Sequence, residues 1–446
     1  MPMLFRHHVP PTLVVQLGAE ALVLLAATSV ASLAMQGLLS GVDAAGVPAC
    51  TAAAALACLL GMVASGVYQR DLRDGPRELL LRSSLGLLLG SVLLLPFAAH
   101  FAPLWPAAAG VLLAGWLGVL AARLGCAPGV LRHRVLVLGT PAQAASLRAL
   151  RRASDRQGSC FVGFIDGGAL APAPGQPTLA ELVRRYAADE VVVALPERRA
   201  ALPLPALLEC KLRGVRVALE AEFIERHLGR VALASLAPGT LVFDEGFRPG
   251  AWRRASQRLF DLLIALPLLA LALPLMAVAA GAIWLEDGGP VFYVQQRTGL
   301  HGRPFRLWKF RSMRRDAEAD GQARWAAAAD DRVTRVGRFL RRTRIDELPQ
   351  LLNVLAGDMS LVGPRPERPT FVAELQQQIP WYALRHHVRP GLTGWAQVRY
   401  SYGASVADAR AKLEYDLYYL KHASLFLDLD ILLHTAQVLL WGRGVR

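Results

Sequence analysis

Four long apolar stretches fill the first quarter of the chain and constrain its fold more than any other feature. They cover about residues 12–36, 47–68, 79–101 and 104–122. Each is close to the roughly 20 residues that an α-helix needs to cross the hydrocarbon core of a bilayer. Their number and their lack of polar faces argue against buried helices of a soluble protein. We therefore expect four transmembrane helices within residues 1–130.

The charges beside these stretches predict their orientation. The segment "MLFRHH" precedes the first stretch, "YQRDLRDGPRELLLR" separates the second from the third, and "RLGCAPGVLRHR" follows the fourth. The other two connections, "SGVDAAG" and "HFAP", contain no Lys or Arg. Because loops rich in Lys and Arg stay on the cytosolic side of a membrane, both ends of this bundle should face the cytosol.

Residues 131–240 have the pattern of a small parallel α/β domain. Short β-branched runs such as "HRVLVLGT" and "DEVVVALP" alternate with helical segments such as "PAQAASLRALRRA", which is typical of strands joined by helices. The first strand ends at Gly139, but the second and third glycines of a GxGxxG loop are missing. A structural or regulatory module is the favoured interpretation, and a bound nucleotide is the open alternative.

A fifth apolar stretch, residues 259–285, is predicted to enter the membrane and turn back. Its length would permit a full crossing. However, "RPGAWRRASQR" precedes it and "RTGLHGRPFRLWKFRSMRR" follows it, so both flanks should remain in the cytosol. Pro267 and Pro274 each remove a helical hydrogen bond and favour a kink. We therefore expect a re-entrant helix that breaks near these prolines.

The side chains that indicate a catalytic function lie in residues 241–446, outside that helix. The chain carries 49 Lys and Arg against 35 Asp and Glu, a formal net charge of +14. Such a balance suits anionic lipid headgroups, phosphorylated substrates or nucleic acid. The five cysteines form no CxxC pair, which argues against a disulfide framework or a zinc site. A nucleic-acid site would need the arginines without adjacent acids, so no nucleic-acid partner is expected.

The adjacent acids Asp346 and Glu347 follow the arginine-rich "DRVTRVGRFLRRTR". The plainer interpretation is a pair of acids at the start of a helix, where negative charge is favoured. The functional interpretation is phosphoryl transfer, with one carboxylate for attack and one for Mg²⁺. Nearby cations should lower the pKa of both acids and keep them ionised. Arg365, held between Pro364 and Pro366, can fix one guanidinium for a bidentate phosphate contact.

Several motifs in a fixed order resemble bacterial polyprenyl-phosphate sugar-1-phosphate transferases over about residues 252–446. They are "FDLLIALPLLALALPL", "QQRTGLHGRPFRLWKFRSM", "RIDELPQLLNVLAGDMSLVGPRPE", "VRPGLTGWAQV" and "YDLYYLK". The preceding spans and α/β domain resemble the large, exopolysaccharide-type members. The resemblance implies a membrane enzyme that moves a sugar phosphate from a UDP-sugar to undecaprenyl phosphate and releases UMP.

The resemblance also implies roles for individual residues. Asp346 would be the nucleophile, Glu347 the Mg²⁺ ligand, and Pro364, Arg365 and Pro366 would hold the phosphates of the nucleotide sugar. Supporting roles in substrate binding fall to residues within matching motifs: Lys309, Arg297, Arg389 and Asp416. One departure is that smaller members break their membrane helix at Ser-Pro, whereas this chain has Leu273-Pro274.

The expected fold is therefore a membrane α/β protein with three parts. Residues 1–130 form four transmembrane helices, 131–240 a Rossmann-like domain, and 241–446 a compact mixed α/β catalytic domain with the re-entrant helix 259–285. The resemblance places it as a multi-pass protein of the bacterial inner membrane, among membrane lipids, with its soluble domains in the cytosol. It also makes a homodimer plausible, although no residue pattern indicates one.

Two other functions remain open. One is a lipid glycosyltransferase that moves the sugar without its phosphate and releases UDP. The other is a membrane-anchored regulator or scaffold of polysaccharide export built on the α/β domain. The sugar cannot be read from the residues; glucose or galactose is what the resemblance suggests.

Overall fold

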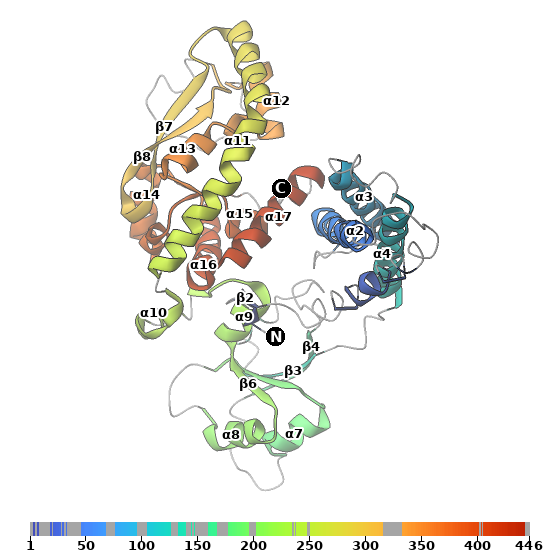
Figure 1. Ribbon diagram of the computed structural model, residues 1–446. Helices are drawn as coiled ribbons and strands as arrows, with labels where there is room; N and C mark the ends of the chain where they lie inside the picture. Colours follow the sequence, from blue (N-terminus) through green and yellow to red (C-terminus); the bar gives the residue numbers. More distant parts are fainter. Residues whose placement is uncertain are drawn as a thin grey trace. The chain divides into compact units, whose positions relative to one another are not determined.

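The computed structural model describes two compact units of the chain (Figure 1). The described residues are 46–67, 76–95, 105–125, 133–139, 159–166, 177–195, 202–233, 238–247, 250–314, 332–400 and 405–441, with a few short pieces elsewhere. One unit comprises Met1–Leu4 and His8–Gly229, and the other comprises Phe5–His7 and Arg230–Arg446. Near the N-terminus, β1 (Met3–Leu4) pairs with β2 (His7–His8).

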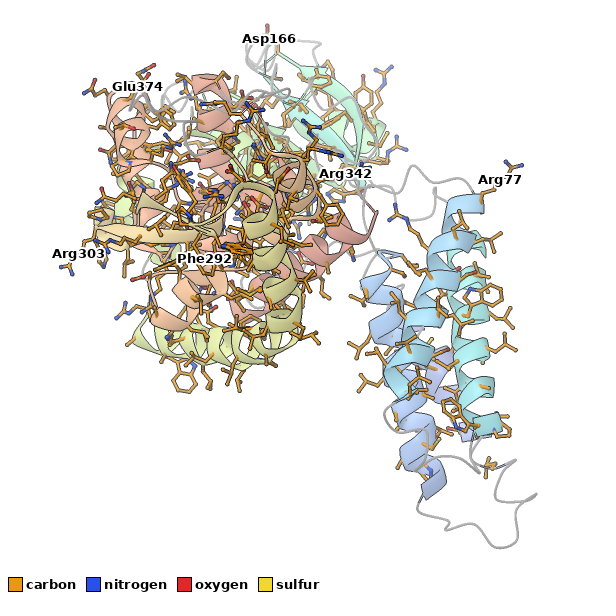
Figure 2. All side chains as sticks on the ribbon, turned by 90° about the horizontal axis from the view of Figure 1, so that it is seen from above. Arg77, Asp166, Phe292, Arg303, Arg342 and Glu374 are labelled. Atoms are coloured by element: carbon orange, nitrogen blue, oxygen red, sulfur yellow. The ribbon has the colours of Figure 1, made fainter. Side chains whose placement is uncertain are left out.

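Three apolar helices lie side by side in the first unit: α2 (Gly46–Ala64), α3 (Pro76–Leu94) and α4 (Trp105–Gly125) (Figure 2). Small residues allow the backbones of α2 and α3 to approach closely, since a Cβ on Gly90 would lie 2.8 Å from the carbonyl oxygen of Ala57. Leucines such as Leu56, Leu88 and Leu117 are exposed on the outside of this bundle. A helical bundle with an apolar exterior suits a lipid surrounding.

The four predicted transmembrane helices are supported only in part. Three of them correspond to helices, whose apolar segments are Pro48–Ala64, Leu79–Leu94 and Trp105–Ala121. The predicted first span, 12–36, falls largely outside the described residues. Among the residues that the structure describes, the one helix long and apolar enough to cross a membrane is Ala251–Asp287. Multiple crossings by the N-terminal helices therefore stay a prediction.

The predicted parallel α/β domain is confirmed as a four-stranded parallel sheet of order β4-β3-β5-β6. The strands are β3 (His133–Leu138), β4 (Ser159–Ile165), β5 (Glu190–Val193) and β6 (Arg216–Leu219), and the helices are α7 (Leu179–Arg185), α8 (Leu204–Leu212) and α9 (Glu220–Leu228). Both central strands are buried along most of their length, as apolar strands of a covered parallel sheet should be. The turn after Gly139, where a nucleotide would bind, lies outside the described residues.

The second unit begins before the predicted domain boundary at residue 240. The backbone amide of Val231 donates to the carbonyl oxygen of Glu414, and the carboxylate of Glu414 accepts from Arg230 and from the amide of Leu233. These contacts attach the segment after Gly229 to a helix of the catalytic unit. Sequence alone could not show this, because the segment has no pattern of its own.

The second unit packs its strands and helices around one main hydrophobic core and a smaller cluster between α11, β8 and α12. Its elements are α10 (Pro238–Phe243), η5 (Glu245–Phe247), α11 (Ala251–Asp287), β7 (Phe292–Thr298), η6 (Leu300–Gly302), β8 (Pro304–Phe310), α12 (Arg335–Thr343), η7 (Ile345–Glu347), α13 (Gln350–Ala356), β9 (Ser360–Val362), α14 (Pro369–Gln378), η8 (Tyr382–His387), β10 (Gly391–Thr393), α15 (Trp395–Arg399), α16 (Val406–His422) and α17 (Leu425–Trp441). Strands β7 and β8 pair antiparallel, whereas β9 and β10 pair parallel. The core gathers Leu351, Met359, Leu413, Leu417 and Ile431, all fully buried.

Helix α11 is continuous through both of its prolines (Figure 1). The expected break into two helical halves at Pro267 or Pro274 is therefore not what the structure has. A proline removes one backbone hydrogen bond and tends to kink a helix, but packing on both sides can keep it helical. Ala265 and Ala272 pack into the protein on either side of Pro267. Whether this helix turns back within a membrane stays a prediction.

At three glycines, the backbone just after β9 lies in direct contact with the backbone of β10 and its flanking residues. A Cβ on Gly363 would meet the carbonyl oxygen of Arg389, and one on Gly394 would meet the carbonyl oxygen of Gly363. A Cβ on Gly391 would meet the amide nitrogen of Gly363. No side chain fits there, so these motifs need glycine for close approach.

We expect Gly363→Ala to lower the free energy of unfolding by at least about 2 kcal/mol, because the added methyl forces the two backbones apart. The measurement is thermal unfolding of the full chain in detergent. Gly281→Ala is the matched control, since nothing lies within 4 Å of a Cβ there. Equal unfolding temperatures for the two variants would contradict the close approach.

Candidate active site

The acid pair lies on a short turn between α12 and α13. Thr334 caps the start of α12 by accepting from the amide of Gly337, and the residue that follows α12, Arg344, is in the left-handed conformation, with φ 61°. A non-glycine residue rarely adopts this conformation. The reversal places Asp346 and Glu347 on η7, next to strand β8.

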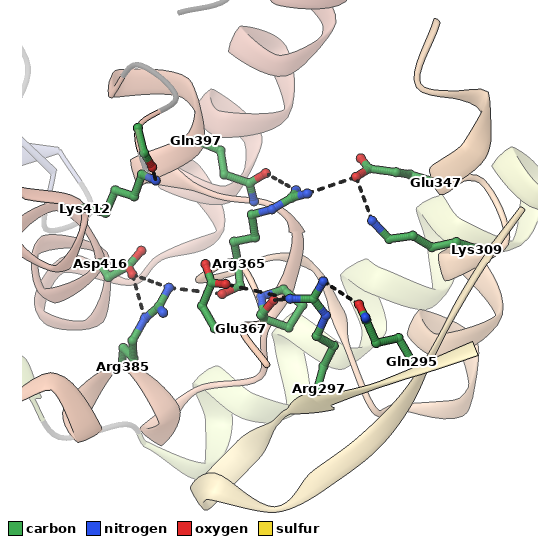
Figure 3. Close-up of polar contacts among 12 residues, drawn as sticks. Gln295, Arg297, Lys309, Glu347, Arg365, Glu367, Arg385, Gln397, Lys412 and Asp416 are labelled. Atoms are coloured by element: carbon green, nitrogen blue, oxygen red, sulfur yellow. Dashed lines mark hydrogen bonds and ion pairs between the residues drawn. The ribbon is translucent and has the colours of Figure 1, made fainter. Parts of the chain in front are cut away.

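Glu347 forms ion pairs with three basic side chains through a single oxygen, and Figure 3 shows those with Lys309 and Arg365. Its Oε1 lies 3.3 Å from Lys309 Nζ, 3.1 Å from Arg365 Nη2 and 3.8 Å from Arg344 Nη1. Burial opposes the charge, but Arg365, Lys309 and Arg344 hold the pKa of this carboxyl far below its usual range. The expectation that cations keep Glu347 ionised is therefore confirmed.

Asp346 differs from its neighbour. Its side chain is buried, at 8% exposed, and Oδ1 has no hydrogen-bond partner among the described residues. Burial and the charge of Glu347 raise its pKa to about 6, against the opposing effect of Lys309, Arg344 and Arg341. The prediction that cations lower the pKa of this acid is thus wrong. The group still ionises near neutral pH, and its Oδ1 is not engaged in a hydrogen bond with any residue that the structure describes.

Lys309 reaches Glu347 because Asn353 fixes its strand. Asn353 Oδ1 accepts from the amide of Trp308 at 3.0 Å, and its Nδ2 donates to the carbonyl oxygen of Arg306 at 2.7 Å. This ties β8 to α13. Burial lowers the pKa of Lys309, although Glu347 opposes that shift. The ammonium therefore lies close to both acids.

Arg365 extends from a turn that is fixed through four consecutive carbonyl groups. The carbonyl oxygens of Pro364, Arg365, Pro366 and Glu367 accept from Gly391 N at 2.9 Å, Arg385 Nη2 at 3.1 Å, Arg297 Nη1 at 3.2 Å and Thr298 N at 2.9 Å, respectively. Prolines have no amide hydrogen to donate, so their carbonyls are the groups left to anchor them. The guanidinium of Arg365 is in turn oriented by Glu347 and by Gln397 Oε1 at 3.2 Å.

Two of the predicted supporting residues, Arg297 and Asp416, contribute to holding the turn that carries Arg365. Arg297 binds the turn at Pro366 and lies 3.8 Å from the carboxylate of Glu367. Asp416 is buried and paired with Arg385, which contacts both the carboxylate and the Arg365 carbonyl (Figure 3). Both residues therefore position the turn.

The role of Arg389 stays a prediction. It lies half-buried before β10, and its charge acts on the buried Asp261 of α11. Pro267 and Pro274 lie within α11, outside the cluster.

Sequence reasoning missed Arg385, Gln397, Asn353 and Arg344. Gln397 Nε2 is buried without a hydrogen-bond partner among the described residues, so this donor is available. Gln397 belongs to the quoted "GWAQV" motif, which was its only signal. The roles of the other three come from tertiary contacts.

The acid pair could hold a hard cation that needs only one or two protein ligands. Among the described residues, no group of three or more His, Cys, Asp or Glu side chains surrounds a common point. A cation here would rest on one or two carboxylates and take its other ligands from water and phosphate, which is how Mg²⁺ binds. The orphaned Asp346 Oδ1 and the Glu347 carboxylate fit that requirement.

The chain matches known proteins over this same unit. A family model described as bacterial sugar transferase matches residues 252–442. The UDP-N-acetylgalactosamine-undecaprenyl-phosphate N-acetylgalactosaminephosphotransferase of Aeromonas hydrophila is 44% identical over 240 residues, which is 54% of this chain and 56% of that protein.

Two glucose-1-phosphate transferases also match. The UDP-glucose:undecaprenyl-phosphate glucose-1-phosphate transferase of Caulobacter vibrioides is 48% identical over 188 residues, 41% of this chain and 69% of that protein. The Escherichia coli (strain K12) protein of the same name is 42% identical over 184 residues, 41% of this chain and 39% of that protein. The chain thus spans about half the length of several relatives that it matches.

Proposed function

Because this chain belongs to the bacterial sugar transferase family, we propose that it transfers a sugar-1-phosphate from a UDP-sugar to undecaprenyl phosphate and releases UMP. One observation carries the proposal. The buried carboxylate of Asp346, with one oxygen that has no hydrogen-bond partner among the described residues, adjoins the carboxylate of Glu347, and the three basic side chains paired with Glu347 can bind phosphate. Such a site supplies a nucleophile and compensates the negative charge of a diphosphate.

Asp346 acts as the nucleophile in this proposal. Its carboxylate oxygen attacks the phosphorus that carries the sugar, the bond from that phosphorus to the UMP oxygen breaks, and UMP leaves with the electron pair. An oxygen of the lipid phosphate then attacks the same phosphorus. The bond to Asp346 breaks, the carboxylate is restored, and the product is a lipid diphosphate sugar.

The cations hold the phosphates during both steps. Arg365 offers its planar guanidinium from a fixed turn, and Lys309 adds a second charge beside Glu347. Buried Gln397 Nε2 supplies a neutral donor. Glu347 would hold Mg²⁺, with Asp346 adjacent, and the ion would neutralise phosphate charge.

Arg365→Lys should lower kcat/KM for the UDP-sugar by about 10- to 100-fold, because an ammonium cannot reproduce the fork that contacts Glu347 and Gln397 together. UMP release measures this. Arg303→Lys is the control, since Arg303 is exposed in the loop before β8. If Arg365→Lys keeps full activity, the bidentate contact is unnecessary.

Helix α11 should enter the membrane from the side on which the active site lies. Near its start, Arg258 donates to the carbonyl oxygens of Val354 and Leu355, both at 2.6 Å. Near its end, Glu286 accepts from the amides of Arg335 and Val336. Both ends are thus attached to one polar unit, and a helix that crosses a bilayer would separate them.

We further propose that the chain lies in the bacterial inner membrane with its catalytic unit in the cytosol, and that it starts assembly of an exopolysaccharide repeat unit. The basic flanks of α11 support that orientation. A homodimer is part of the same proposal.

A panel of UDP-sugars with undecaprenyl phosphate and Mg²⁺ tests the function, with the released nucleotide identified. The panel includes UDP-N-acetylgalactosamine and UDP-glucose. Release of UMP with one of them is the expected result. Release of UDP would indicate a lipid glycosyltransferase, and no release from folded protein would favour a scaffold of polysaccharide export.

A further inference from the structure

The two units of the chain are joined through a single glycine. Helix α9 ends at Leu228, Gly229 follows in the left-handed conformation with φ 62°, and the second unit begins at Arg230. The amide of Gly229 still donates to the carbonyl oxygen of Glu225 in α9, at 3.0 Å. Because no longer linker separates the units, a displacement of the last turn of α9 acts directly on the backbone at Arg230.

Buried polar side chains fix the last turn of α9 to the parallel sheet. Glu190, at the start of β5, is 0% exposed and accepts from Arg226 Nη2 at 2.6 Å. His133 of β3 contacts the other carboxylate oxygen of Glu190 at 2.8 Å. His227 Nε2 lies 3.0 Å from Ser159 Oγ, at the start of β4. The end of α9 therefore moves with the sheet of the α/β domain.

Glu414 of α16 holds the chain on the other side of the glycine. Its carbonyl oxygen accepts from the amide of Val231 at 3.0 Å. Its carboxylate accepts from Arg230 Nη1 and from the amide of Leu233, both at 3.1 Å. Val231 and Leu233 are buried in the main core of the second unit. Glu414 thus fixes the whole segment through three hydrogen bonds.

Helix α16 connects Glu414 with the turn that carries Arg365. A helix rotates by roughly 100° per residue, so Glu414 and Asp416 project from nearly opposite faces of α16. Asp416 pairs with Arg385 at 3.0 and 2.8 Å, and Arg385 Nη2 donates to the carbonyl oxygen of Arg365 at 3.1 Å (Figure 3). A shift of α16 is therefore passed to the backbone of Arg365 through one ion pair and one hydrogen bond.

We propose that Glu414 is a positioning residue through which the α/β domain controls the placement of Arg365 and so the use of the UDP-sugar. The inference rests on the proposed function, because UMP release is its main readout. Coupling between distant sites travels through contiguous packed and hydrogen-bonded contacts. The contacts from Glu190 to Arg365 form such a series, which is covalently continuous at Gly229. The α/β domain then has a regulatory role in the reaction.

Glu414→Gln tests the second half of this connection. The variant keeps an oxygen that can accept from the amide of Leu233, but it loses the charge that pairs with Arg230. We expect kcat/KM for the UDP-sugar to fall at least about fivefold, because the position of Arg365 is no longer fixed. Glu374→Gln is the matched control, since Glu374 is exposed on α14.

A double variant distinguishes positioning from a general loss of stability. If Glu414 acts through Arg365, Glu414→Gln should lower kcat/KM by less than about twofold when Arg365→Lys is already present. A purely structural effect would instead multiply the two losses. Multiplied losses, or an unchanged kcat/KM in Glu414→Gln alone, would overturn the proposal.

Arg226→Met tests the first half of the connection, since it frees the end of α9 from Glu190. We expect kcat/KM for the UDP-sugar to fall at least about threefold, and we expect no further fall when Glu414→Gln is already present. Arg213→Met is the matched control, because Arg213 is half exposed at the end of α8.

Ser159→Ala is the milder second variant, in case Arg226→Met unfolds the α/β domain. It removes only the hydroxyl beside His227 and should lower kcat/KM in the same direction. Thermal unfolding shows which variants are folded. An unchanged kcat/KM in the folded variant, or an equal fall with and without Glu414→Gln, would show that the α/β domain does not act through Glu414.

Hydrogen exchange measures the same coupling without turnover. The amides of Thr298 and Gly391 donate to carbonyl oxygens of the Arg365 turn. Both should exchange severalfold faster in Glu414→Gln than in the unaltered protein, whereas the amides of α8 should not change. Equal exchange at Thr298 and Gly391 in the two proteins would overturn the proposal. Failure of the unaltered protein to release UMP would contradict the proposed function instead.

Discussion

Asp346→Asn should lower turnover by at least about 10⁴-fold, because a carboxamide oxygen cannot displace UMP from the diphosphate. The matching chemical result is the loss of a covalent phosphosugar on residue 346, measured by mass spectrometry of the intact protein after mixing with the UDP-sugar and Mg²⁺. Asp358→Asn is the control, since Asp358 lies beyond α13, where its carboxylate accepts from Asn353 Nδ2 at 3.4 Å. Appreciable UMP release by Asp346→Asn would contradict the covalent route.

The same substitution should stabilise the fold. Burial raises the pKa of Asp346 to about 6 from 3.8, so the folded protein binds the proton more tightly than the unfolded chain does. Stability from this group is present at low pH and is lost as the pH rises through 6. Keeping the ionised acid in the fold at neutral pH then costs about 3 kcal/mol.

Removal of the charge should therefore raise the unfolding temperature at pH 7.5, measured with chelator present and no substrate. The gain should shrink towards pH 5, where the folded protein already carries Asp346 protonated. A lower unfolding temperature at pH 7.5 would show that the Asp346 charge contributes favourably through Lys309 and the nearby arginines.

Arg385→Met should lower the free energy of unfolding by about 3 to 5 kcal/mol, because it leaves Asp416 buried and unpaired. Asp416 is 1% exposed, and Arg385 contacts it at 3.0 Å through Nε and at 2.8 Å through Nη2. Chemical unfolding in detergent measures the change. UMP release should fall as well, since Arg385 also holds the carbonyl of Arg365.

The double variant Arg385→Met with Asp416→Leu separates the two effects. With both charges removed, most of the stability should return, since apolar replacement of a buried ion pair is often neutral. UMP release should stay low, because the Arg365 carbonyl still lacks its donor. If activity returns with stability, Arg385 contributes only to folding.

The acid pair and its cations could be predicted because their signals are local. Asp346 and Glu347 are adjacent, the two prolines surround Arg365, and Lys309 lies within the quoted motif "QQRTGLHGRPFRLWKFRSM". The structure places Lys309 on strand β8 and brings Lys309, Arg365 and Glu347 together.

What could not be predicted depends on burial or on distant contacts. The acids are neighbours in sequence, yet burial leaves one with a raised pKa while cations lower that of the other. Arg385 and Asp416 meet across 31 positions of sequence separation, and no spacing rule indicates that pairing. Continuity of α11 through its prolines likewise depends on the packing of both halves.

The anchoring of the Pro364-Arg365-Pro366 turn limits how such a site can be transplanted. Its four carbonyl contacts come from strand β7, η8 and strand β10, which are far apart in the chain. A chimaera that imports "VGPRPE" alone would bring the arginine without its supports. We therefore expect a chimaera to exchange donor-sugar preference between relatives only when Arg297, Arg385 and Gly391 are transferred together with the turn.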